Sequence, residues 1–301
     1  MIELEKLTKT YGRKDSGIHN ISVELKDGKI YGLVGENGAG KTTLIKTITG
    51  IFRQNSGYIS INGYDSTRER TQALMNVGLM PDGVILNLDR SVLQLISYYG
   101  QTRGMREDES VEKARMLLIR FGLGEKLHNA SLRRLSLGQK RRAMLAMCMM
   151  NDPSNILMDE PYNGFDPEGM RMMNELITYE RSKGKTIIIS SHILKELESI
   201  VDEIIFIKNG KITDQMEISS LDKVGKRKIL FSVSNPDDEI LNLMEEFGGI
   251  RKIGNQYEIS LPPDKIHKPE DINTALVKSG YKVSSFRVEN PTLEDLYFSK
   301  K

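Results

Sequence analysis

Residues 35–42 narrow the possible folds of this 301-residue chain more than any other segment. Their sequence, Gly-Glu-Asn-Gly-Ala-Gly-Lys-Thr, fits the pattern G-x-x-x-x-G-K-[S/T]. An apolar run precedes it at residues 30–34, and a segment of helical composition follows at 42–49. The glycines let backbone N–H groups converge on phosphate oxygens, and the helix directs its positive end at the same anion. The sequence therefore predicts a strand, a phosphate-binding loop and a helix; a glycine-rich turn without a ligand is the alternative.

Two side chains of this loop and two later carboxylates suit a nucleotide and its metal. Lys41 is expected to reach the β- and γ-phosphates, and the Thr42 hydroxyl to bind Mg²⁺. An apolar strand at residues 155–158 ends in Asp159 and Glu160. We expect Asp159 to hold the Mg²⁺ shell and Glu160, on the opposite side of the extended chain, to orient or deprotonate the attacking water. The alternative for this pair is an ordinary exit from a strand into a loop.

A second candidate anion site lies between these elements, at Leu135-Ser136-Leu137-Gly138-Gln139, before a basic and then apolar helix. Ser136 is placed to cap this helix, and Gly138 permits a close approach of the backbone. One nucleotide needs both helix ends only if the chain folds around it or if a second copy supplies one of them. A capped helix that binds nothing is the alternative.

The order of elements predicts two domains. Strands and helices alternate as in βαβ units, which favours a parallel sheet, and residues 91–121 have the helical spacing of an insert. The expected strands span 2–4, 18–25, 30–34, 57–62, 155–158, 186–190 and 203–207, and the expected helices 42–49, 169–182 and 193–200. Residues 217–227 are charged and polar and are predicted to be a linker. Residues 228–301 follow the order βαββαβ, which is typical of a ferredoxin-like domain.

Composition excludes several other classes of protein. Lys and Arg number 43 against 41 Asp and Glu, so the net charge of +2 gives no indication of nucleic-acid binding. Cys148 is the one cysteine, which rules out a disulfide framework or a cysteine-rich metal site and indicates a reducing compartment. The charged start of the chain does not read as an export signal, and the longest apolar run, 143–150, is too short to span a membrane. We therefore expect a protein that stays in the cytosol and reaches a membrane through a partner.

The order of these segments, followed by His192 after the strand at 186–190, resembles the ATP-binding subunit of ATP-binding cassette (ABC) transporters. The resemblance covers residues 1–216. It implies an α/β P-loop ATPase domain with an antiparallel β subdomain and a helical insert. It also implies that ATP and Mg²⁺ are buried between two head-to-tail ATP-binding subunits, each signature segment facing the phosphate loop of the opposite protomer, and that a transmembrane permease is the partner.

The resemblance assigns further roles. Tyr11 would stack on adenine, Asp166 would lie on the loop that touches the other protomer, and His192 would contact the γ-phosphate. Taken alone, these are a surface tyrosine, a helix cap before Pro167 and a polar cap. The expected catalytic residues are thus Glu160 and His192, and the expected metal ligands Thr42, Asp159 and Asp82. The expected nucleotide-binding residues are Tyr11, Gly35, Asn37, Gly38, Ala39, Gly40, Lys41, Thr42, Thr43, Ser136, Gly138, Gln139 and Asp166.

Some positions depart from the family pattern or were left open. Asp82 stands where the family usually has Gln, and Leu137 replaces a usual glycine. The insert, from about residue 87 to 130, would receive a helix of the permease, with Tyr98 and Tyr99 either in that groove or in the insert's own core. The tail, residues 290–298, resembles drug, antibiotic and lipid exporters, and predicts an export subunit on the inner face of the cell membrane. An importer with a regulatory C-terminal domain, or a soluble ABC ATPase acting on nucleic acid or the ribosome, remain alternatives.

Overall fold

The computed structural model describes residues 1–12, 16–83, 89–221, 225–237, 239–261 and 268–299. Two compact units divide the chain, Met1–Met216 and Glu217–Lys301. None of the helices in these described ranges combines the length and the apolar character needed to cross a lipid bilayer.

The first unit is built on a six-stranded sheet of order β10-β9-β3-β8-β7-β6. β6, β7, β8, β3 and β9 run parallel to their neighbours, as the predicted βαβ units require. Every residue of β3, β7 and β8 is buried, which explains their unbroken apolar sequences. The strands are β3 Ile30–Val34, β6 Val77–Met80, β7 Asn155–Asp159, β8 Thr186–Ser190, β9 Glu203–Lys208 and β10 Lys211–Glu217.

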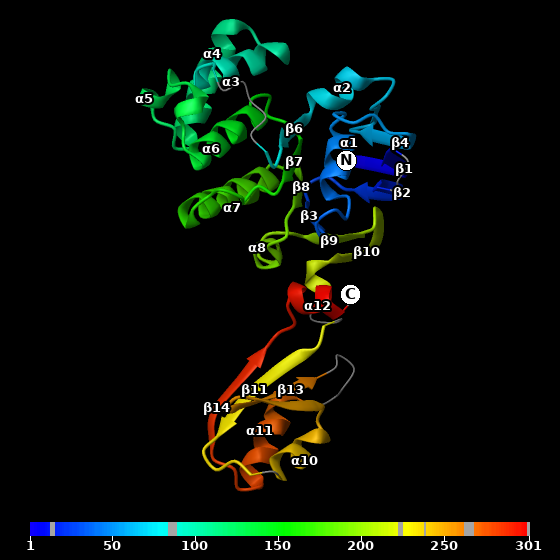
Figure 1. Ribbon diagram of the computed structural model, residues 1–301, viewed down its shortest axis with the longest axis vertical. Helices are drawn as coiled ribbons and strands as arrows, with labels where there is room; N and C mark the ends of the chain where they lie inside the picture. The colour runs from blue at the N-terminus through cyan, green and yellow to red at the C-terminus, as the bar shows by residue number, and fades with distance from the viewer. Residues whose placement is uncertain (13–15, 84–88, 222–224, 238, 262–267, 300–301) are drawn as a thin grey trace. The chain divides into compact units, whose positions relative to one another are not determined.

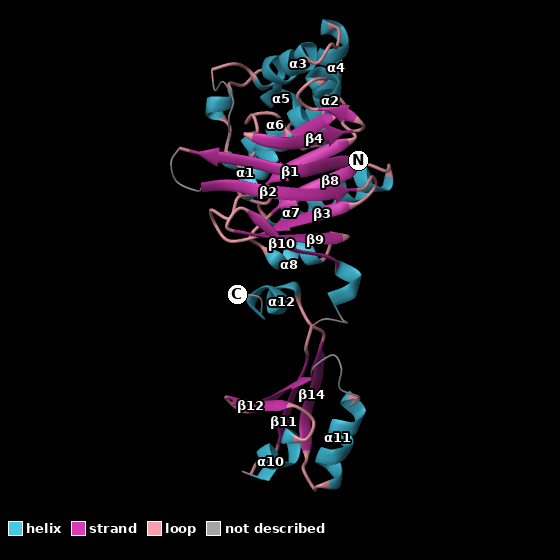
Figure 2. Cartoon of the chain, turned by 90° about the vertical axis from the view of Figure 1, so that its right-hand side faces the viewer, coloured by secondary structure: helices cyan, strands magenta, loops and turns pink. Residues whose placement is uncertain are grey.

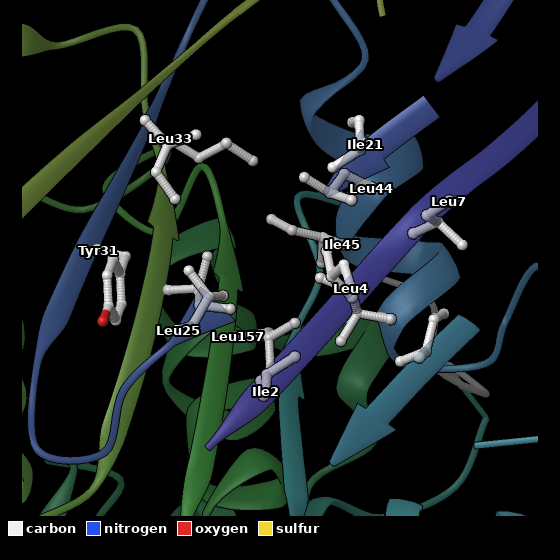
Figure 3. Packing of buried hydrophobic residues seen from close by; sticks show 14 of the residues in the cluster. Ile2, Leu4, Leu7, Ile21, Leu25, Tyr31, Leu33, Leu44, Ile45 and Leu157 are labelled. Carbon is white, nitrogen blue, oxygen red and sulfur yellow. The ribbon is translucent and has the colours of Figure 1, made fainter. Parts of the chain in front are cut away.

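A second sheet, of order β2-β1-β4-β5, is antiparallel and encloses helix α1 (Lys41–Ile48) against the first. Its strands are β1 Ile2–Tyr11, β2 Ser16–Leu25, β4 Ser56–Ile61 and β5 Tyr64–Asp65, with helix α2 at Arg70–Met75. One apolar cluster fills the space: Leu44 and Ile45 of α1 meet Leu4 of β1 on one side and Leu33 of β3 on the other (Figure 3). This core fixes the first turn of α1 at the end of β3.

The opposite face of the parallel sheet carries α7 (Pro167–Ser182) and α8 (Leu194–Glu198), as Figure 1 shows. Gly32 of β3 is needed here, because a Cβ at this position would lie 2.8 Å from Ile204 and 3.2 Å from Val201. The helical insert contains α3 Val92–Thr102, α4 Glu107–Arg120 and α5 Glu125–His128, and is followed by the 3₁₀ turn Leu132–Arg134 and α6 Leu137–Cys148. Residue 87, the predicted start of this insert, lies outside the described residues.

The second unit has a four-stranded antiparallel sheet of order β12-β13-β11-β14, with α10 and α11 on one face (Figure 2). β13 lies between β11 and β12, so this is the split βαβ arrangement that the order of elements predicts. Its elements are β11 Arg227–Val233, α10 Glu239–Glu245, β12 Gly249–Ile253, β13 Gln256–Leu261, α11 Pro269–Lys278, β14 Val283–Glu289 and a final helix, α12 Leu293–Ser299.

Several predicted boundaries were wrong for identifiable reasons. The predicted strand ended at Leu4, whereas β1 continues to Tyr11. The prediction stopped short because irregularities at Leu7 and Lys9 break the alternation of residues that marks a strand. β10 was not predicted, because it is an edge strand of alternating half-buried and exposed residues. The predicted linker at 217–227 contains the end of β10, a 3₁₀ turn at Ile218–Ser220 and the first residue of β11, while residues 222–224 lie outside the described part.

Candidate functional site

The loop after β3 has the backbone that a phosphate site requires. Gly38 and Gly40 have φ values of +83° and +112°, in the region that side chains disfavour. A Cβ at Gly35 would lie 2.4 Å from the carbonyl oxygen of Ile207, so only glycine fits where the loop leaves the sheet. At Gly38 a Cβ would meet nothing within 4 Å, which leaves space for a ligand to approach the backbone. The loop leads into α1, whose N-terminal N–H groups point into the same space.

Lys41 is buried at the start of α1, with 6% of its surface exposed. Its ammonium donates to the carbonyl oxygens of Gly35 at 2.7 Å and Glu36 at 3.2 Å, so it lies across the loop from which it projects. Three expected nucleotide-binding residues accompany it: Asn37 and Thr42 are exposed, and Thr43 is half-buried beside them. Ala39 is buried against the core.

Asp159, the last residue of β7, lies at the same edge of the sheet. It pairs in register with Ser190, and Ser190 in turn lies beside Leu33 at the end of β3. The Ser190 hydroxyl donates to Asp159 Oδ1 at 2.6 Å. Asp159 is 1% exposed, and within the part of the chain that is described no lysine or arginine forms an ion pair with it. A buried carboxylate with no charged partner is a site for a cation.

Glu160 follows Asp159 in an unusual backbone conformation, with φ at +48°. Its amide donates to the carbonyl oxygen of Ser190 at 3.0 Å and to the Ser190 hydroxyl oxygen at 3.1 Å. Its carboxylate Oε2 lies 2.7 Å from Nδ1 of His192 and accepts the His192 amide at 3.3 Å. The Glu160 side chain is 13% exposed, against 56% for His192. The sequence predicted both residues for this site but not that they bond to each other.

Ser136 and Gln139 form a reciprocal capping box at the start of α6. The Ser136 hydroxyl accepts the Gln139 amide at 3.2 Å, and Gln139 Oε1 accepts the Ser136 amide at 3.0 Å. A cleft of about 550 Å³ opens beside this helix end. Its described lining contains no residue of the phosphate loop, and consists of Gly122, Ser136, Gly138, Gln139, Arg142, Gly164, Phe165, Asp166 and Glu168. The chain therefore carries two separate candidate anion sites.

Asp166 joins this cleft as the N-cap of α7, where its Oδ1 accepts the Gly169 amide at 2.8 Å. Leu137 is 59% exposed at the start of α6, and a Cβ at Gly164 would lie only 3.0 Å from it. The leucine that departs from the family pattern thus packs against the loop that precedes Asp166. Gly138 is also close to that loop, since a Cβ there would lie 3.3 Å from the Gly164 carbonyl oxygen.

Tyr11 is 37% exposed at the end of β1. Its ring meets the Phe52 ring edge-on at 5.5 Å between centroids, and the Lys9 ammonium lies 5.6 Å from the Tyr11 centroid. Its hydroxyl is 3.5 Å from Thr43 Oγ1, which connects it to the first turn of α1. Tyr11 therefore places a partly exposed aromatic ring beside the start of α1.

Asp82 is 53% exposed, and its side chain is held by two neighbours. The Asn163 amide donates to Asp82 Oδ1 at 3.0 Å, and Arg141 Nη2 lies 3.7 Å from the same oxygen. The carboxylate is thus directed to the loop after β7. Its expected role as a metal ligand stays a prediction.

Comparison with known proteins decides the family. The ABC transporter family model matches residues 18–163. The bacitracin transport ATP-binding protein BcrA of Bacillus licheniformis is 30% identical over 304 residues, which cover 100% of this chain and 96% of the relative. The lantibiotic transport ATP-binding protein SrtF of Streptococcus pyogenes is 33% identical over 234 residues, 77% of this chain and 98% of the relative. The chain belongs to the ABC transporter family.

A solved structure of an ATP-binding subunit of an ABC transporter agrees, with a TM-score of 0.68 and 25% identity over 73% of this chain and 91% of that one. The protein is therefore an ATP-binding subunit with the α/β P-loop ATPase fold. It hydrolyses ATP, associates with a second ATP-binding subunit and works with transmembrane permease subunits.

Sequence reasoning missed one residue of this ABC subunit, Arg141 in α6. Arg141 belongs to the basic start of this helix, at residues 140–142, yet it is 1% exposed. It bonds to the backbone of two segments that reach the site, at Pro81 after β6 and at Glu160 and Asn163 after β7. The available signal was its position: it lies three residues before Met144 and four before Leu145, both of which are buried on the same helix.

The two tyrosines of the insert differ in position. Tyr98 is 61% exposed on α3. Tyr99 is half-buried, accepts a hydrogen bond of 2.7 Å from Arg103, and has its pKa raised by burial. Of the two alternatives, Tyr99 belongs to the packing of the insert, and Tyr98 is the residue that a partner can reach.

Proposed function

We propose that this ABC ATP-binding subunit powers the export of an antibiotic, most simply a peptide antibiotic. The observation that carries the proposal is the similarity to the bacitracin transport protein, which extends over the whole chain and includes the second unit as well as the ATPase unit. A second relative, similar over 77% of this chain, is named a lantibiotic transport protein.

For ATP binding we assign the phosphate groups to the loop at residues 35–43, with Lys41 compensating the charge of the β- and γ-phosphates. The left-handed glycines and the open space above Gly38 support this assignment. Tyr11 supplies a face for the adenine ring, because it is exposed next to Thr43.

A magnesium ion fits the donors at this edge of the sheet. Thr42 and the buried Asp159 would hold it, and it would neutralise charge on the phosphates. Within the described residues no cluster of three or more His, Cys, Asp or Glu side chains could hold a metal alone. That accords with Mg²⁺, which commonly relies on one or two carboxylates together with substrate phosphates.

For hydrolysis we assign Glu160 as the group that orients and deprotonates the attacking water. His192 is bonded to Oε2 of the Glu160 carboxylate. It would hold that carboxylate in place and face the γ-phosphate. Ser136, Gly138, Gln139 and Asp166 would bind the nucleotide held by the opposite subunit. The separation of their cleft from the phosphate loop supports a head-to-tail dimer, because within one subunit the two sites do not meet.

The permease would hold this subunit on the inner face of the cell membrane. The exposed Tyr98 on α3 supports the insert as the surface that contacts it. The proposal is tested by coexpressing the subunit with candidate permeases, in wild-type form and as Glu160→Gln, and measuring copurification in detergent and growth with bacitracin. A permease that copurifies with both forms, and resistance that requires Glu160, is the expected result. Copurification without any change in susceptibility to peptide antibiotics would contradict the cargo.

A further inference from the structure

Among the described residues Arg141 is the largest fully buried side chain, although it carries a charge that is costly to remove from water. Its guanidinium is bonded to backbone carbonyl groups. Nε donates to Asn163 at 2.8 Å, Nη1 donates to Pro81 at 2.8 Å and also to Asp82, and Nη2 donates to Glu160 at 2.6 Å. One planar cation on α6 thus joins the segment after β6 to the loop after β7.

The positive charge of Arg141 is only weakly compensated by a negatively charged side chain. Asp82 Oδ1 is 3.7 Å away, beyond the range of a normal hydrogen bond, and Asp82 is half in solvent. Burial lowers the pKa of the Arg141 guanidinium, and the nearby carboxylates of Asp82, Asp159 and Glu160 oppose that shift. A buried arginine of this kind is weak evidence for stability, so its geometry needs another explanation.

The bond of Arg141 to Glu160 suggests that explanation. Glu160 has a φ of +48°, a conformation that costs a residue with a side chain free energy and persists only when the surroundings impose it. The Ser190 carbonyl and hydroxyl hold the Glu160 amide, and Arg141 Nη2 holds the Glu160 carbonyl. Both peptide groups that flank the Glu160 Cα are therefore anchored. Together they fix the direction in which its carboxylate leaves the chain.

We infer that Arg141 is a positioning residue for the carboxylate of Glu160. It acts through the peptide backbone and does not touch the substrate. Arg141 is part of α6, and the start of α6, capped by Ser136, forms the second anion site. The Arg141 side chain therefore also couples the direction of the Glu160 carboxylate to the position of this helix. Movement of α6 or of the segment at Asp82 would shift Glu160. Hydrolysis would therefore depend on the positions of both α6 and that segment. The inference rests on the proposed role of Glu160 in hydrolysis.

Three variants of the full-length chain test it. Arg141→Met keeps a long side chain but removes every donor. Arg141→Lys keeps the charge but replaces the planar fork by a single ammonium, which can serve fewer carbonyls at once. Arg68→Ala is the matched control, since Arg68 is an 86% exposed arginine with one ion pair of 3.8 Å on the antiparallel side of the unit. Each is assayed for ATP affinity, for kcat and KM of hydrolysis, and for amide hydrogen exchange without nucleotide.

For Arg141→Met we expect kcat to fall by about ten- to a hundredfold, because small misplacements of a catalytic group have effects of this size. The KM and the affinity for ATP should change by less than about threefold, since the phosphate loop does not contact Arg141. Arg141→Lys should recover part of kcat, and Arg68→Ala should behave as wild type. A merely structural role predicts instead that ATP affinity and kcat fall together with folding, and that lysine restores nothing.

Hydrogen exchange gives a readout that needs no hydrolysis. The Asn163 and Phe165 amides bond to the carbonyl oxygens of Glu160 and Tyr162 at 3.2 Å each. Their exchange should quicken in Arg141→Met, while the amides of β7 stay protected. A folded Arg141→Met or Arg141→Lys with normal kcat and unchanged exchange overturns the inference. If instead the exchange responds but wild-type hydrolysis survives Glu160→Gln, the anchoring holds and the proposed catalytic role of Glu160 fails.

Discussion

Glu160 and His192 share one oxygen: Oε2 of the glutamate lies 2.7 Å from Nδ1 of the histidine and also accepts the histidine amide at 3.3 Å. The two residues come from the ends of different segments, the exit of β7 and the loop after β8. Because the amide contact does not depend on the tautomer of the ring, His192 can hold the carboxylate whatever its protonation state.

Glu160→Gln tests this arrangement directly. The glutamine amide has the same shape and can keep its contact with His192, but it cannot accept a proton. We expect kcat to fall by about 10²- to 10⁴-fold, the usual contribution of a general base, while ATP affinity stays near the wild-type value. An ATP-bound dimer should accumulate, which size-exclusion chromatography with ATP and Mg²⁺ will detect. Hydrolysis at the normal rate would show that another group activates the water.

Lys41→Ala should act on binding instead. The ammonium lies over the phosphate loop and is the one charge that the loop itself offers to the β- and γ-phosphates. Its loss should weaken ATP affinity by at least about tenfold, in line with the loss of a charge-assisted bond. Isothermal titration with ATP measures this. Lys46→Ala is the matched control, because Lys46 lies farther along α1 beside the Phe52 ring. Equal affinities for the two variants would exclude the phosphate-loop assignment of Lys41.

Ser136→Arg should block dimer closure without affecting the monomer's own ATP site. The new side chain would fill the cleft at the start of α6, which the phosphate loop does not line. Affinity for ATP should remain, whereas the ATP-induced dimer of a Glu160→Gln background should disappear. Ser136→Ala removes the capping bond, worth about 1 kcal/mol, and the hydroxyl without adding bulk, so it should weaken the dimer less than arginine does. A dimer that persists with arginine at this position would contradict the proposed contact between subunits.

Tyr11→Ala should reduce ATP affinity by about five- to a hundredfold, the range for loss of one stacked base. Tyr11→Phe keeps the ring and loses only the 3.5 Å contact with Thr43, so its affinity should stay close to wild type. Fluorescence titration with a labelled ATP analogue compares the two. Equal losses for alanine and phenylalanine would indicate that the hydroxyl, and not the ring, matters.

The elements around the phosphate loop could be predicted because local sequence and burial agree there. β3 and α1 lie within one residue of the predicted positions. β3 is buried on both faces and therefore has an unbroken apolar sequence, and α1 directly follows the glycines of the phosphate loop. Where tertiary contacts determine the bounds of an element, the sequence alone did not predict those bounds. The length of β1 depends on irregular pairing with β2 and β4, and β10 lies at a sheet edge with little apolar sequence to mark it.

The site shows the same division. The loop residues and the carboxylates of β7 follow from spacing along the chain, so motifs could locate them. The bond between Glu160 and His192, and the bonds of Arg141 to Pro81 and Asn163, join segments far apart in sequence. A charged residue in a basic run is usually exposed, and nothing local distinguishes Arg141 from its neighbours Lys140 and Arg142.

The C-terminal segment at residues 290–298 contains most of helix α12, and the pH dependence of its stability can be tested. Thr292 caps α12: its hydroxyl accepts the Asp295 amide at 3.1 Å, and Asp295 Oδ2 accepts the Thr292 amide at 3.1 Å. Asp295 also forms an ion pair with Lys228 of β11. Burial raises the pKa of Asp295, but the bonds from Lys228 and Thr292 outweigh it, and the pKa lies below its ordinary value of 3.8.

A lowered pKa means that the ionised carboxylate stabilises the folded state. Its contribution is complete above the unfolded pKa near 3.8 and is lost as the pH falls through the lower folded value. Asp295→Asn should therefore lower the free energy of unfolding at pH 7 by about 1 kcal/mol, and the difference from wild type should narrow as the pH falls below about 4. Urea unfolding followed by a single tryptophan, Tyr297→Trp, reports on α12 because the chain has no other tryptophan. Glu294→Gln, an exposed neighbour on the same helix, should show a much smaller effect. A difference between wild type and Asp295→Asn that stays constant down to pH 3 would show that the carboxylate charge does not stabilise this helix.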